Sequence, residues 1–99
     1  MAKYQLSSQA AAALEDIYVY TALTFGADQA EAYHESFHRI FSLLADFPKL
    51  GKSADELIPG WRQFRHMKHL IFYTPDSDPM TIQAVIHGSM DVRKHLMDE

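Results

Sequence analysis

The sequence contains no cysteine and no apolar run that approaches the length of a membrane span. Without cysteine, disulfide bonds and thiolate zinc sites are excluded, and a reducing compartment is allowed. Because a membrane-spanning helix needs about 20 largely apolar residues, no membrane partner is predicted. The N-terminal stretch also lacks the apolar centre of a signal peptide, and acids arrive at Glu15 and Asp16. These absences predict a cytoplasmic, soluble protein.

Positive charge is scarce, with 9 Lys and Arg against 13 Asp and Glu and a net charge of -4. An acidic protein is a poor general binder of nucleic acid, because such binding depends on neutralising phosphates. Residues 59–75 are the exception, since they hold basic and histidine side chains and no acid: Arg62, Arg65, Lys68, His66 and His69. We therefore predict one local basic patch and no strong direct binding of nucleic acid.

Two helices are predicted in the first half of the chain. Ser7 or Ser8 can cap the first helix, and Gly26 can close it because glycine tolerates the left-handed conformation. Its predicted inner face consists of Ala10, Ala13, Leu14, Ile17, Tyr20, Thr21 and Thr24. Asp28 is the predicted cap of the second helix. Because the connection is very short, residues 8–47 should form an antiparallel helical hairpin.

Strands are predicted before and after this hairpin. KYQLS predicts a first strand, and WRQFRH and HLIFYTP predict two strands around a tight turn near Met67 and Lys68. MTIQAVIH predicts a last strand, whose apolar residues should share one face: Met80, Ile82, Ala84 and Ile86. A short final helix should follow Asp91. The order β-αα-βββ-α indicates an α+β fold in one domain over 1–99, with the N-terminal strand and the hairpin packed on a small antiparallel sheet.

HESFH is the motif that most resembles a metal site, since His34 and His38 lie one helical turn apart. Zinc proteases hold Zn²⁺ with this spacing and use the intervening Glu as general base. No further His follows at the spacing of such enzymes, and Glu35 falls on the polar face beside Arg39. A zinc protease is therefore rejected, and no metal or other cofactor is predicted.

The basic stretch WRQFRHMKH could hold phosphates or an acidic protein surface, and a solvated hairpin face is the open alternative. His66, His69 and His87 could transfer protons in metal-free RNA cleavage, although no fixed spacing identifies them as catalytic. Val19 and Leu23 lie at i and i+4, away from the main stripe of the first helix. They are weak evidence for a partner site, and an open sheet edge offers another.

Taken together, five segments resemble the ParE branch of the RelE/ParE toxins of bacterial type II toxin–antitoxin systems. They span nearly the whole chain in order: YQLSSQAAAALEDIYVYTALTFG, QAEAY, FPKLGK, PGWRQFRHMKHLIFY and IQAVIHGSMD. The resemblance implies a helical hairpin on an antiparallel sheet, and a ParD-like antitoxin that wraps the toxin with a C-terminal helix and an extended segment. ParE members are associated with inhibition of DNA gyrase by binding, without a known covalent step.

The resemblance therefore implies a binding inhibitor and not an enzyme. The alternatives are a ribosome-dependent mRNA endoribonuclease of RelE type and a non-toxic regulatory module. The acidic balance and the absence of Tyr after Tyr73 favour ParE, because RelE members often use a C-terminal Tyr. The predicted target-binding residues are Arg62, Arg65, Lys68, His69, His87 and Ser89. The predicted antitoxin-binding residues are Val19, Leu23 and Tyr33, with a sheet edge.

Three positions depart from the family pattern, which often has Arg where Lys52, Lys68 and Ser89 stand. Lys keeps the charge but loses the planar fork of Arg, and Ser89 loses the charge altogether. If the last of these arginines matters for poisoning gyrase, activity here should be reduced or redirected.

Overall fold

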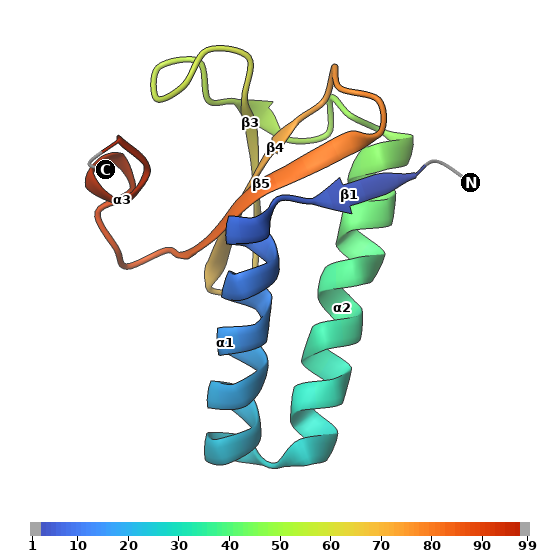
Figure 1. Cartoon of the computed structure of the whole chain (residues 1–99), viewed down its shortest axis with the longest axis vertical. Coiled ribbons are helices and arrows are strands. Elements are labelled where there is room, and N and C mark those ends of the chain that lie inside the picture. The colour runs from blue at the N-terminus through green and yellow to red at the C-terminus, as the bar shows by residue number, and fades with distance from the viewer. Residues whose placement is uncertain (1–2, 98–99) are drawn as a thin grey trace.

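A computed structural model describes residues 3–97, in which two long helices pack against a five-stranded sheet (Figure 1). The elements are β1 (Tyr4–Leu6), α1 (Ser8–Phe25), α2 (Ala27–Asp46), β2 (Lys52–Ser53), β3 (Arg62–His66), β4 (His69–Thr74), β5 (Met80–His87) and α3 (Val92–Met97). The strand order is β1-β5-β4-β3-β2, with β1 parallel to β5 and all other neighbours antiparallel. The predicted α+β fold is confirmed, and β2 is a strand that the sequence analysis did not predict.

The helical hairpin is built on two caps. Ser7 is the N-cap of α1, and its Oγ accepts a hydrogen bond from the Ala10 N–H at 3.0 Å. Gly26, with φ of 99°, both ends α1 and precedes the first residue of α2. The prediction that Asp28 caps α2 is wrong, because a connection of one residue already places Asp28 inside the helix.

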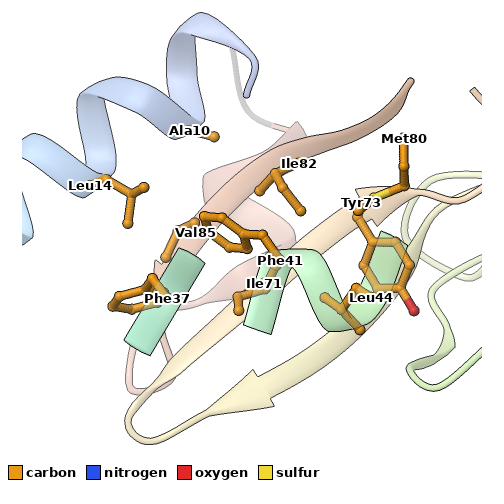
Figure 2. Packing of buried hydrophobic residues seen from close by; sticks show 10 residues of the cluster. All are labelled: Ala10, Leu14, Phe37, Phe41, Leu44, Ile71, Tyr73, Met80, Ile82 and Val85. Atoms are coloured by element: carbon orange, nitrogen blue, oxygen red, sulfur yellow. The ribbon is translucent and has the colours of Figure 1, made fainter. Parts of the chain in front are cut away.

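The main core lies between the hairpin and the sheet (Figure 2). From α2 it receives Phe37, Phe41 and Leu44, which share one side of the helix because they lie at i, i+4 and i+7. All three are 0% exposed. They meet side chains from α1, β4 and β5, namely Ala10, Leu14, Ile71, Tyr73, Met80, Ile82 and Val85. This packing holds the two helices at a fixed place on the sheet.

A β-bulge in β5 gives the sheet a second apolar face. Phe72 pairs with Ala84 while Tyr73 pairs with Ile82, so Gln83 has no partner in β4. The extra residue reverses the alternation, and β5 therefore sends Met80, Ile82 and Val85 to the main core and Ala84 and Ile86 to the other face. The prediction that Met80, Ile82, Ala84 and Ile86 share one face is wrong for this reason. Trp61, Leu57, Val92 and Leu96 cover the second face.

The hairpin is longer than the sheet that it covers. Helices of 18 and 20 residues measure about 27 and 30 Å at 1.5 Å per residue, and their connected end extends past the strands (Figure 1). Apolar side chains at that end remain in solvent: Tyr20 is 65% exposed, Leu23 84% and Phe25 67%. Tyr20 therefore lies on the predicted side of α1 but is not buried there.

Candidate functional site: a basic turn beside a groove

The turn between β3 and β4 consists of Met67 and Lys68, and it joins the paired residues His66 and His69. Met67 adopts a left-handed backbone with φ of 56° and is 68% exposed. Such a conformation is unfavourable for a bulky side chain and is found preferentially at functional sites. The turn thus presents an apolar side chain and a cation to solvent.

Gly88 joins this turn to the segment after β5. Its N–H donates to the Lys68 carbonyl at 2.7 Å. A Cβ built on Gly88 would lie 3.1 and 3.2 Å from the two terminal nitrogens of Arg65 and 3.2 Å from the Lys68 carbonyl oxygen. The Arg65 guanidinium therefore lies against the bare backbone of residue 88, a close approach that a side chain would disturb.

His87 and Ser89 complete the arrangement. The Ser89 N–H donates to His87 Nδ1 at 3.1 Å, and Ser89 Oγ lies 2.7 Å from the same nitrogen. Five of the six predicted target-binding residues therefore lie at the same end of the sheet, and we call them the basic turn surface: Arg65, Lys68, His69, His87 and Ser89. Arg65 and His69 leave opposite faces of the sheet, because Arg65 pairs with Leu70 of the second cluster whereas the His69 ring contacts Phe37 of the main core.

Arg62 lies apart from this surface. Its Nε donates to the Gly51 carbonyl at 3.0 Å, and a terminal nitrogen donates to the Lys49 carbonyl at 3.3 Å. The guanidinium therefore holds the loop after α2 against β3. This geometry gives Arg62 a role in stability, and its role in target binding stays a prediction.

Three histidines form a row across neighbouring strands at one end of the sheet. His66 pairs with His69, and His69 pairs with His87. Two side chains of α2 reach this row: Tyr33 Oη lies 2.9 Å from His69 Nδ1, and Ser36 Oγ lies 2.8 Å from His66 Nε2. The row therefore forms part of the contact between α2 and the sheet.

The histidines of the row that contact α2 carry little charge at neutral pH. Burial, with smaller effects from His87 and His66, lowers the pKa of His69 to about 4. Burial also lowers the pKa of His66, with a smaller effect from Arg39. The positive charge of the basic turn surface therefore comes from Arg65 and Lys68, both of which are exposed.

A groove of about 530 Å³ separates the overhanging hairpin from the β3–β4 turn. We call it the hairpin groove; its lining is largely apolar or aromatic on the helix side, and its turn side is formed by Met67, Lys68 and two histidines. It is lined by Asp16, Ile17, Tyr20, Thr21, Phe25, Gln29, Tyr33, Met67, Lys68, His69 and His87. Three residues, Lys68, His69 and His87, belong both to this groove and to the basic turn surface.

Only one of the three predicted antitoxin-binding residues lines this groove. Tyr33 does, whereas Val19 and Leu23 are 49% and 84% exposed on another side of α1. Tyr20, Phe25 and Met67 also line the groove and are 65%, 67% and 68% exposed, and the sequence analysis did not assign them to a partner site. In the sequence, the only sign of their exposure was their position in or near the two turns, the helix connection at Gly26 and the β3–β4 turn.

His34 and His38 lie on α2 with ring centroids 4.8 Å apart. Within residues 3–97, no group of three or more His, Cys, Asp or Glu side chains is arranged to hold a metal ion. The same part of the chain contains no helix with the length and apolar character needed to cross a membrane.

The chain is similar over nearly its full length to proteins of one family. The family described as "ParE toxin of type II toxin-antitoxin system, parDE" matches residues 4–92. Toxin ParE1 of Mycobacterium tuberculosis is 34% identical over 95 residues, which cover 95% of this chain and 97% of the relative. Toxin ParE1 of Caulobacter vibrioides is 32% identical over 96 residues, which cover 97% of this chain and 99% of the relative.

A solved structure shows the same fold. One chain described as "Chromosomal ParDE TA system from P. aeruginosa" matches with a TM-score of 0.73, covering 88% of this chain and 96% of that chain. The two sequences are 17% identical, so this likeness concerns the fold alone.

Proposed function

Because the chain belongs to the ParE toxin family of type II toxin–antitoxin systems, we propose that it inhibits DNA gyrase by direct binding and that a cognate antitoxin neutralises it. The observation that carries the proposal is that three segments meet at one end of the sheet and expose basic and hydrogen-bonding side chains there. Arg65 comes from β3, Lys68 from the turn, and His87 and Ser89 from the end of β5 and the residues after it.

The charge of this surface suits binding to an acidic partner. Arg65 and Lys68 are exposed cations, and the lowered pKa of His69 keeps that ring neutral. The neutral His69 imidazole and the Ser89 hydroxyl offer hydrogen bonds in place of charge. An acidic surface of gyrase, or DNA held by gyrase, would meet two cations flanked by neutral hydrogen-bonding groups.

The residues that the two features share support the proposed neutralisation. Lys68, His69 and His87 line the hairpin groove and also belong to the basic turn surface. An antitoxin helix seated in the groove would pack its apolar side chains on Tyr20 and Phe25 and cover these three residues. The antitoxin would then inactivate the toxin by covering the surface that binds gyrase.

Removal of one charge tests the gyrase proposal. We expect Arg65→Ala to weaken inhibition of supercoiling by purified gyrase roughly tenfold or more, because a charged contact at the target is lost. Lys94→Ala removes an exposed cation from α3 and should leave inhibition within about twofold, a ratio close to experimental error. Equal inhibition by folded Arg65→Ala and wild-type protein would remove Arg65 from the surface. Cleavage of ribosome-bound mRNA with unimpaired supercoiling would instead indicate the RelE-type activity.

A second pair of variants tests where the antitoxin binds. Phe25→Ser removes an aromatic group from the hairpin groove, and we expect roughly tenfold weaker binding of the cognate antitoxin. Leu23→Ser removes a similarly exposed apolar group outside the groove and should change that affinity by less than about twofold. Isothermal titration calorimetry measures both affinities. The opposite order of effects would place the antitoxin on Val19 and Leu23, as the sequence analysis predicted.

A further inference from the structure

The two histidines of HESFH lie side by side on α2, although the zinc protease interpretation of this motif is rejected. His34 and His38 project from the same side of α2, with ring centroids 4.8 Å apart and ring planes at 63°. Both are half-buried, which leaves part of each ring accessible from solvent. Side chains at i and i+4 are neighbours on a helix, so two imidazoles here can reach one ion.

Contacts with neighbouring elements hold each ring in place. Tyr4 Oη of β1 shares a hydrogen bond of 2.5 Å with His38 Nδ1. Tyr18 of α1 packs edge-on against the His34 ring, with centroids 5.7 Å apart and planes at 89°. Phe41, from α2 itself, packs edge-on against the His38 ring, with centroids 5.6 Å apart. Fixed rings lose less conformational freedom when they bind a ligand, which favours affinity.

The hydrogen bond to Tyr4 uses Nδ1 of His38 and leaves Nε2 available to bind a metal ion. When Nδ1 carries the proton and donates to Tyr4 Oη, Nε2 keeps its lone pair for a ligand bond. Histidines that bind metals commonly donate their other N–H to an oxygen in this way, which fixes the tautomer and the orientation.

We propose that His34 and His38 form a two-histidine chelate for a divalent transition metal ion of the imidazole-binding class, with Cu²⁺ bound most tightly. Affinity at nitrogen sites rises along the first-row series to Cu²⁺. The space above the pair is lined by Glu35, Arg39, Ser42 and Asp46 as well as the two histidines. Two acids against one arginine give that space a net negative charge. Water would fill the remaining coordination positions, since residues 3–97 place no third ligand beside the pair.

Titration of the tag-free full chain with CuCl₂, followed by electron paramagnetic resonance, tests the proposal. We expect one Cu²⁺ per chain at this site, with hyperfine structure from two imidazole nitrogens. His34→Asn should weaken binding roughly tenfold or more and leave the signal of one imidazole, because one ligand is lost. His95→Asn is the matched control: it removes an exposed histidine from α3 and should leave both readouts unchanged.

Two further observations keep the test decisive. His38→Asn should match His34→Asn in its effect on binding, and far-UV circular dichroism verifies that each variant remains folded. Binding should also weaken as the pH falls, because protons compete for the imidazole nitrogens. Wild-type affinity in both folded variants, or stronger loss in His95→Asn than in either, would overturn the proposal.

Discussion

The buried hydroxyl of Tyr73 provides the sharpest test of how the loop after α2 is attached to the sheet. The ring is 0% exposed, and its Oη donates to the Pro48 carbonyl at 2.8 Å and accepts from the Gly51 N–H at 3.0 Å. Tyr73→Phe removes one oxygen and retains the ring that packs against Leu44 and Met80 (Figure 2). The substitution therefore isolates the two hydrogen bonds from the packing of the core.

The expected loss of stability follows from the two backbone groups that lose their partner when the hydroxyl is removed. A buried polar group that loses its partner costs about 1–3 kcal/mol. The Gly51 N–H is enclosed, since a Cβ on that residue would lie only 2.6 Å from Tyr73 Oη and 3.0 Å from the carbonyl carbon of Gln63. The Pro48 carbonyl is half-buried and can recover part of its loss from water. We therefore expect Tyr73→Phe to lower the free energy of unfolding by about 2–4 kcal/mol.

Urea unfolding monitored by circular dichroism measures this change, and thermal unfolding should show a midpoint lowered by roughly 10 °C or more, given the size of the domain. Tyr20→Phe is the matched control, because Tyr20 is 65% exposed and its hydroxyl can exchange hydrogen bonds with water. The control should unfold within about 0.5 kcal/mol of wild type. A Tyr73→Phe protein that also unfolds within this margin would refute the assignment of the hydroxyl as a buried attachment point.

Three further predictions concern stability. Arg62→Ala should lower the free energy of unfolding by about 1–3 kcal/mol, because charged hydrogen bonds are lost, and urea unfolding measures this change. Gyrase inhibition by the folded variant should stay within about twofold of wild type, which corresponds to less than 0.5 kcal/mol. Supercoiling assays measure that inhibition. Ser7→Ala should cost about 1–3 kcal/mol, because Ser7 Oγ caps α1 and also donates to the Gln83 carbonyl at 2.8 Å, whereas Ser8→Ala should cost less in the same urea assay. Acid should destabilise the fold: the unfolded chain protonates His69 near pH 6.5, whereas the folded ring stays neutral down to about 4. The free energy of unfolding should therefore fall across this interval by roughly 1–2 kcal/mol, after allowance for solvent at the half-buried ring, and His69→Asn should flatten the pH dependence measured by urea unfolding.

The grouping of the basic turn surface could be predicted because it depends on connectivity. In an antiparallel meander, the β3–β4 turn and the end of β5 must lie at the same end of the sheet. The grouping of Arg65, Lys68, His87 and Ser89 at one end of the sheet therefore follows from the order of three consecutive strands. Arg62 could not be separated from them in this way, because its contacts depend on where the 48–51 loop returns to the sheet.

The hairpin groove depends on lengths that local patterns do not reveal. Helical spacing placed Tyr20 on the inner face, and it does lie on the side of α1 that faces the turn. Whether that side is covered depends on how far the strands extend beside the helix, which is a property of the assembled fold. The prediction of which β5 side chains share one face was wrong for a similar reason. The bulge at Gln83 inserts one residue, and no turn signal in the sequence marks it.

Shared residues couple the two proposed binding events. Lys68 lies in both the hairpin groove and the basic turn surface, whereas Arg65 belongs only to the surface and Phe25 only to the groove. Lys68→Ala should therefore weaken both gyrase inhibition and antitoxin binding, while Arg65→Ala weakens mainly the first and Phe25→Ser mainly the second. Supercoiling assays and calorimetry on the three variants measure these pairs of effects. If Lys68→Ala changes only one of the two affinities, the antitoxin and gyrase bind separate surfaces, and neutralisation must act by some means other than direct coverage.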